Sequence, residues 1–214
     1  MQNSLKQLLV ELDQTFQGSH IFRSASAENK RWFYSLVDGY CSTNQPLLIG
    51  FNWGAGKNIS YKPQNLDDDN DFAPPDLGGS MSRVRQYLAA HLPNHQIENM
   101  NQTNYCFFRS EIESQIDESD LVRCQPIFKK LIELLKPSVV ICFSSRLRDY
   151  LLSAKLVSIE DTDTMTLNFN RGRVKSTYTV MKGRFESGVV VNFLPHPNYQ
   201  MTRDARVKAW EFCF

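Results

Sequence analysis

The sequence predicts an α/β protein with a doubly wound, mainly parallel sheet. Continuous apolar runs of strand length recur along the chain, amphipathic helical segments separate them, and turns rich in glycine or proline end them. Strands that helices cover on both faces are typically unbroken apolar runs. With 214 residues, of which 42% are hydrophobic, the chain can form one core, so we expect a single domain over residues 1–214.

The first half of the chain is expected to open with an amphipathic helix over residues 4–16, where leucines recur at helical spacing. The run PLLIGFNWG at residues 46–54 ends in glycines and predicts a first buried strand. Residues 58–79 are dense in Asp, Asn, Pro and Gly, which predicts a long loop, and such loops are often functional. A helix over residues 83–91 and a short strand over residues 103–108 follow.

The second half continues the alternation of helix and strand. Its first helix contains Pro126, which we expect in an early turn or at a kink because proline cannot complete the helical hydrogen bonds. The expected elements are, in order, a helix over 120–136, a strand over 138–143, a helix over 145–155, a β-hairpin insertion over 164–187, a strand over 188–198 and a closing helix from Arg203.

Charge is distributed unevenly, although the whole chain carries a formal charge of only +1. Residues 60–120 contain four basic and eleven acidic side chains, whereas residues 171–208 contain eight basic and two acidic ones. The basic stretch is suited to a polyanion, which it would contact through phosphates. No apolar run reaches the length of a membrane span, so we expect a cytoplasmic protein without a membrane partner.

Cysteine usage argues against a disulfide framework. The five cysteines are odd in number and widely spaced, and no CxxC pair occurs, so a closed zinc site also has little support. Buried free thiols are the expected state. The cysteines are Cys41, Cys106, Cys124, Cys142 and Cys213.

Polar residues gather where three predicted strands end, within residues 50–56, 104–109 and 196–203. Ligands of doubly wound sheets bind beyond the carboxyl ends of the strands, so these segments are the candidate site. A phosphate-binding loop is not indicated, because Phe51 stands where its first glycine would be and Asn58 replaces the hydroxyl residue after the lysine.

The motifs at these three strand ends together resemble those of the uracil-DNA glycosylase superfamily, over about residues 46–210. The segments that carry the resemblance are GFNWG, TNYCFFRS, DLVRCQPIFKKLIELLKPSVVICFSS and VVVNFLPHPN. Gly50, Asn52 and Gly54 match the family motif that positions the hydrolytic water, except that Trp53 replaces its proline. His196-Pro197 matches the late His-Pro-Ser motif, which differs here at Asn198. The resemblance implies a three-layer α/β/α sandwich with a central, mainly parallel four-stranded sheet.

The resemblance also implies a role for each site residue. Asn52 would orient the attacking water, and His196 would stabilise the departing base. Asn104 would read the flipped base, with Phe51, Trp53 and Phe72 as its aromatic surroundings and Tyr61 behind them. Among the residues after His196, the side chains placed to enter the vacated stack or meet a phosphate are Tyr199, Gln200, Met201 and Arg203.

The function so implied is that of a monofunctional DNA glycosylase, which flips out uracil or a related damaged or modified pyrimidine and excises it by hydrolysis during base-excision repair. DNA is then the partner, and we expect a monomer without an obligatory protein partner. No cofactor is expected, because only Cys124 has a counterpart among the four cysteines of iron–sulfur members. No metal is expected either, since the carboxylates Asp67, Asp68, Asp69 and Asp71 are interpreted as solvated surface.

Three alternatives remain open at this stage. A glycosylase for a bulkier modified base, for example in defence against modified phage DNA, would suit Trp53 and the loop over residues 58–79. A catalytically inactive nucleic-acid-binding module of the same fold would suit the neutral Asn52. A serine hydrolase that uses Ser144 or Ser145 with His196 ranks last, because the sequence lacks the GxSxG elbow.

Overall fold

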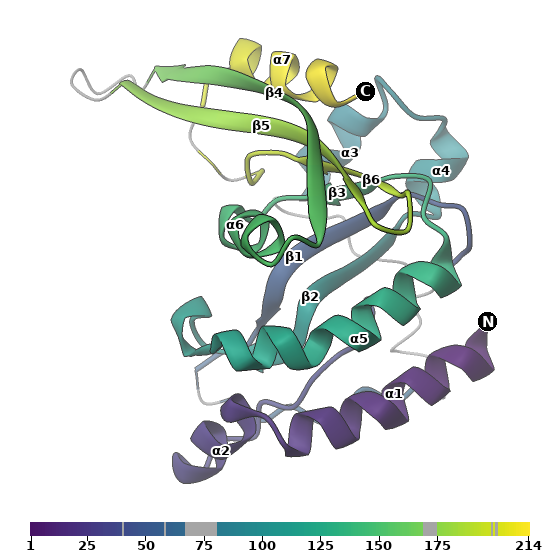
Figure 1. Ribbon diagram of the computed structural model, residues 1–214, viewed down its shortest axis with the longest axis vertical. Helices are drawn as coiled ribbons and strands as arrows, with labels where there is room; N and C mark the ends of the chain where they lie inside the picture. The colour runs from purple at the N-terminus through teal and green to yellow at the C-terminus, as the bar shows by residue number, and fades with distance from the viewer. Residues whose placement is uncertain (40, 58, 67–80, 169–174, 198, 200) are drawn as a thin grey trace. The chain divides into compact units, whose positions relative to one another are not determined.

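The computed structural model describes residues 1–39, 41–57, 59–66, 81–168, 175–197, 199 and 201–214 (Figure 1). The chain divides into two units. The first unit contains Met1–Asn44, Ile49–Pro75 and Asn101–Lys136, and the second contains Gln45–Leu48, Asp76–Met100 and Pro137–Phe214. Strand β1, Leu47–Gly54, belongs to both, because its first two residues fall in the second unit and the remainder in the first.

The first unit builds its core from helices that pack beside β1 and its neighbour β2, Asn101–Ser110. The long helices α1, Gln2–Gln17, and α5, Glu118–Leu135, run side by side, and α5 packs on β2 (Figure 1). The apolar face of α1 is buried, as its leucine spacing predicts. The Phe16 ring meets the ring of Phe108 with centroids 5.4 Å apart. The short helices of this unit are α2, His20–Ala27, and the 3-10 turn η2, Glu113–Gln115.

One buried carboxylate joins the beginnings of two helices in the first unit. Asp120 Oδ1 accepts from the backbone N–H of His20 at 2.8 Å, and Asp120 Oδ2 accepts from that of Asp117 at 3.2 Å. Burial raises the pKa of Asp120 above its ordinary value, although these N–H donors favour the charged form. A carboxylate suits this place, because it satisfies N–H groups that have no partner inside their own helices.

The second unit orders its strands β1-β3-β6-β5-β4, with β3 and β6 parallel and β5 antiparallel to both of its neighbours. In Figure 1 the strands β4 and β5 form a long hairpin, on which α7 packs. The buried core of this unit includes Leu88, Ile141, Val180 and Trp210. The elements are α3, Met81–Leu88; α4, Asn94–Glu98; β3, Val140–Cys142; α6, Ser145–Ser153; β4, Val157–Asn168; β5, Lys175–Phe185; β6, Val190–Phe193; and α7, Arg203–Cys213.

The structure confirms the α/β class but has a mixed, six-stranded sheet in the part of the chain that it describes, not a four-stranded one. The difference arises at the hairpin, because Met181–Arg184 of β5 pairs antiparallel with Val190–Phe193 of β6 and so extends the sheet. Pro126 is the ninth residue of α5, so it lies beyond the early turn of the helix, which continues past it to Leu135. Helices α2 and α4 were not predicted, and the five residues of α4 are too few to show a helical period.

No helix in the described part of the chain combines the length and the apolar content that crossing a membrane requires.

Candidate functional site

The Asn52 amide at the end of β1 is held in one orientation. Its Nδ2 donates to the backbone oxygen of Trp53 at 2.9 Å and to Ser110 Oγ at 2.8 Å, with a longer contact of 3.4 Å to Phe108 O. Ser110 Oγ gives its own proton to Ile112 O at 2.9 Å, so toward Asn52 it can only accept. Three acceptors therefore surround the amide nitrogen, which leaves the Asn52 oxygen on the other side of the amide as an acceptor.

The Asn104 amide lies against β1 at Gly50. A Cβ atom on Gly50 would overlap Asn104 Oδ1, so glycine is what makes room for this side chain. Asn104 is only 9% exposed, and the described residues provide no hydrogen-bond partner for its side-chain amide. Contrary to expectation, Asn104 is the fourth residue of β2 and lies within the strand, not at its carboxyl end.

A cation–π cluster fixes the segment that follows β1. Arg109 donates to Gly54 O at 3.1 Å and to Ser35 Oγ at 2.8 Å. Its guanidinium carbon lies 4.5 Å from the ring centroid of Tyr61 and 5.8 Å from that of Trp53. The Trp53 indole N–H donates to Ser35 O, so the indole presents its ring and not its N–H group to a ligand. Arg109 ends the predicted site segment 104–109, but no role was predicted for its side chain.

Phe51 and Phe72 were both expected to contact the base, and the structure describes only Phe51. Phe51 is 3% exposed, because neighbouring residues of a strand point to opposite faces and Phe51 alternates with the half-buried Asn52. Its ring is buried in the core here, and its assignment to base binding stays a prediction. Phe72 lies outside the described residues.

In the second unit, a buried arginine fixes the turn that carries His196. The His196 carbonyl accepts from Tyr199 N at 2.8 Å and from Arg206 Nη1 at 3.3 Å, and Arg206 Nη2 donates to Tyr199 O at 2.6 Å. Arg206 is 5% exposed, and this burial lowers the pKa of its guanidinium. The His196 side chain is exposed beyond the end of β6. Arg206 was not predicted as a site residue, although its spacing from Ala209 and Trp210 places it on the buried face of α7.

The residues expected to contact the DNA backbone and stack lie next to this turn. Tyr199, Met201 and Arg203 line a cavity of about 780 Å³ between α3 and α7 of the second unit. Tyr199 is 40% exposed, and Arg203 is the first residue of α7. Gln200 and Asn198 lie outside the described residues.

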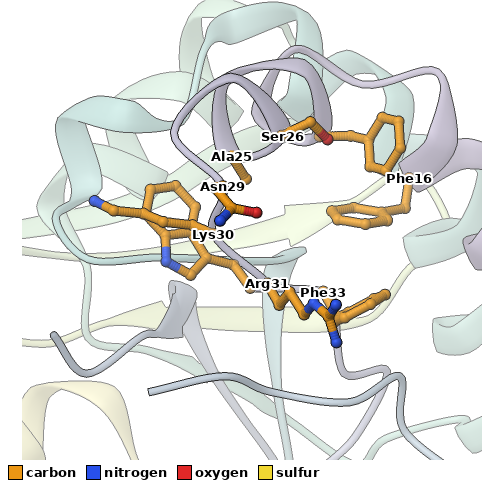
Figure 2. A pocket seen from close by; sticks show the side chains of 9 residues that line it. Phe16, Ala25, Ser26, Asn29, Lys30, Arg31 and Phe33 are labelled. Atoms are coloured by element: carbon orange, nitrogen blue, oxygen red, sulfur yellow. The ribbon is translucent and has the colours of Figure 1, made fainter. Parts of the chain in front are cut away.

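A smaller pocket of about 250 Å³ lies in the first unit, near the ends of α1 and α2 (Figure 2). The side chains of Phe16, Phe33 and Lys30 are among those that line it. The Lys30 ammonium already pairs with Glu28 at 2.8 Å and Glu111 at 3.0 Å, so its charge is compensated within the protein. None of the predicted site residues lines this pocket, and we assign it no function.

The remaining candidate groups have structural roles or lie outside the description. Ser144 Oγ accepts from Leu147 N at 3.1 Å and so caps α6. All five cysteines are buried and unbridged, as expected, and burial raises the pKa of Cys142 to about 12. The Asp67–Asp71 segment falls outside the described residues, among which no three His, Cys, Asp or Glu side chains are grouped as metal ligands.

Neither a scan against protein-family models nor a search of curated proteins found a match to this chain. The residues and their contacts are therefore the basis for a functional assignment. The first unit brings Asn52, Trp53 and Asn104 together on neighbouring strands, and the second unit brings the His196 turn and Arg203 together.

Proposed function

We propose that the protein is a monofunctional DNA glycosylase that removes uracil or a related modified pyrimidine. The observation that carries this proposal is the Asn104 amide, which is buried and has no hydrogen-bond partner among the described residues. An amide both donates and accepts, which matches the adjacent N–H and carbonyl groups on the edge of uracil. A flipped base would supply hydrogen bonds that the amide does not make within the described part of the protein.

The orientation of Asn52 suits the hydrolytic step. Its oxygen would accept a hydrogen bond from a water and direct that water at C1′ of the deoxyribose. The bond from C1′ to the base nitrogen breaks, and its electron pair leaves with the base. The water oxygen bonds to C1′ and loses its proton to solvent or the departing base. Because an amide cannot take up that proton at neutral pH, we expect slower chemistry than with an aspartate at this position.

The exposed His196 suits stabilisation of the departing base. Hydrogen bonds from Arg206 and Tyr199 restrain the His196 backbone, and the His196 side chain is exposed. A donor placed toward a base oxygen would stabilise the negative charge that develops there. In this proposal Trp53 forms a wall of the base site, Tyr199 enters the vacated stack, and Arg203 contacts a phosphate.

A second candidate function is nucleic-acid binding without catalysis. The observation that favours it is the neutral Asn52, whose amide nitrogen is committed to acceptors of the protein itself. This module would bind DNA in a salt-dependent manner and release no base.

End-labelled oligonucleotides distinguish the two functions. The purified protein is incubated with DNA that carries uracil, hypoxanthine, hydroxymethyluracil or glucosylated hydroxymethylcytosine, and abasic sites are then cleaved by alkali and resolved on a gel. We expect cleavage of at least one substrate, and a loss of about 100-fold or more in Asn52→Ala and in His196→Ala. The control is His95→Ala, which changes an exposed histidine of α4 and should keep full activity.

Circular dichroism establishes that each variant is folded. Cleavage that is unchanged in both site variants would overturn the proposed chemistry. DNA binding without an abasic product on any of the four substrates would favour the non-catalytic module. A strict preference for the glucosylated base would assign the bulkier substrate class.

A further inference from the structure

The cavity between α3 and α7 shares Tyr199 and Arg203 with the proposed glycosylase site, but its α3 wall has no role in the proposed base excision. It lies wholly in the second unit, and its volume of about 780 Å³ falls within the usual range for ligand sites. Arg83, Tyr87 and His91 line one side of it. Arg203, Arg206 and Glu211 line the other.

Positive charge dominates this cavity, since its walls contain three arginines and one acidic residue, Glu211. Arg206 is committed to the carbonyls of the His196 turn. Arg83 and Arg203 are exposed, and neither forms an ion pair within the described part of the chain. Besides burial, the charge of Arg83 lowers the pKa of Arg206, so the two cations influence each other. An anion bound here would relieve that repulsion.

A stack of aromatic rings borders the same cavity. Tyr87 stacks on Trp210 with centroids 5.7 Å apart and an interplanar angle of 14°. Trp210 continues to Phe214 at 6.0 Å and 8°, and Phe214 stacks on His91 at 5.1 Å and 14°. Trp210 is 2% exposed, whereas Tyr87 and His91 are half-buried and reach the cavity. An unpaired nucleobase can extend such a stack.

Charge and stacking in one cavity point to one ligand chemistry, a phosphate joined to a flat ring. We infer that this cavity binds a nucleotide of a single-stranded nucleic acid, with its phosphate at Arg83 and Arg203 and its base against Tyr87. A single strand is favoured over a duplex because only an unpaired base can stack on protein rings. A strand is favoured over a free nucleotide because residues 171–208 carry a sequence charge of plus six. Glu160, Asp161 and Asp163 of the paired strand β4 reduce this to plus three, which is still more than one nucleotide neutralises. The inference concerns binding and does not depend on base excision.

Fluorescence anisotropy with a 5′-labelled 12-nucleotide oligothymidylate tests the site. The dissociation constant is measured across a series of salt concentrations for the wild type, Arg83→Ala and the matched control Arg85→Ala. Arg85 has the same charge on the same helix and is exposed, but it does not line the cavity. We expect Arg83→Ala to weaken binding about tenfold and to lower the slope of log K against log salt by about 0.7, the value for one phosphate contact to a single strand. Arg85→Ala should change binding less than twofold.

Tyrosine variants test the stacking separately from the charge. Tyr87→Leu should weaken binding about tenfold without a change in salt slope, and Tyr87→Phe, which keeps the ring, should bind like the wild type. Urea denaturation establishes that each variant folds, because Tyr87 packs on Trp210. If Tyr87→Leu does not fold, the binding of Arg83→Ala compared with that of Arg85→Ala tests the inference by itself.

Three results would overturn the inference. The first is an equal effect of Arg83→Ala and Arg85→Ala, which would indicate general attraction to a polyanion. The second is binding of a 12-base-pair duplex as tight as that of the single strand. The third is competition by thymidine monophosphate at the concentrations at which the oligonucleotide binds, which would indicate a site for free nucleotides. Because binding is measured without base release, a failure here is distinct from a failure of the proposed glycosylase activity.

Discussion

The two units differ in how they treat the polar side chains of their candidate sites. In the first, the Asn52 amide is oriented by acceptors from three residues, and Arg109 is fixed by hydrogen bonds and aromatic rings. In the second, Arg83 and Arg203 face a cavity with no ion pair in the described chain. A catalytic rate increases when the fold orients the reacting groups before the substrate binds. The affinity for an anionic ligand increases when the protein has positive charges that the ligand neutralises.

Each unit also contains one exception. The first has a side chain without a hydrogen-bond partner among the described residues, and the second has one that hydrogen bonds hold in place. Asn104 lies next to the fixed Asn52 network but has no partner for its amide among the described residues. Arg206 lies three residues after the open Arg203 but is buried and bonded to two carbonyls. Each unit therefore contains a hydrogen-bonded side chain close to one without such bonds in the described part of the chain. Substitutions in both members of a pair can compare their effects on activity or stability.

The largest effect on activity is expected when the Asn104 amide is displaced. Gly50→Ala places a Cβ atom on Asn104 Oδ1, so the amide must move from its position. We expect kcat/KM for base release to fall about 100-fold, as for the loss of one well-placed hydrogen-bonding group. Gly54→Ala changes another glycine of the same motif without displacing Asn104, because nothing lies within 4 Å of its added Cβ. Equal activities of the two variants in the gel assay would contradict a role for Asn104.

The next effect compares the two arginines of α7. Arg206→Gln removes the donors of the His196 and Tyr199 carbonyls, and we expect the free energy of unfolding to fall by about 2–3 kcal/mol. Arg203→Gln changes an exposed side chain and should alter it by less than about 0.5 kcal/mol. Urea denaturation measures both. The same midpoint for the two variants would show that Arg206 does not hold the turn.

The smallest effect tests the orientation of Asn52. Ser110→Ala removes one of the acceptors that fix the amide nitrogen, so the amide can rotate. We expect kcat to fall about tenfold, equivalent to about 1.4 kcal/mol, with KM unchanged because Ser110 does not touch the substrate in this proposal. The exposed Ser114→Ala on η2 should match the wild type. A rise in KM with an unchanged kcat would assign Ser110 to binding instead of positioning.

Much of the fold could be predicted because its signals are local. Apolar runs predicted the strands that became β1, β3 and β6, and leucine spacing predicted the helix that became α1. The six-stranded sheet could not be predicted in this way. The pairing of β5 with β6 joins segments that follow one another, but whether a hairpin stands alone or extends a sheet depends on the edge available to it.

The candidate site likewise has residues that local sequence could predict and residues that it could not. Local sequence singled out Asn52, Asn104 and His196 through their motifs, and their roles in base excision remain predictions. No role was predicted for Ser110, Arg109 or Arg206, because each acts through a contact with residues distant in the sequence or with backbone carbonyls. Phe51 was assigned to the base because an aromatic residue beside a motif gives no sign of which face of the strand it occupies. Residue type and spacing are properties of the chain, whereas burial, orientation and the choice of partner arise only when distant segments pack together.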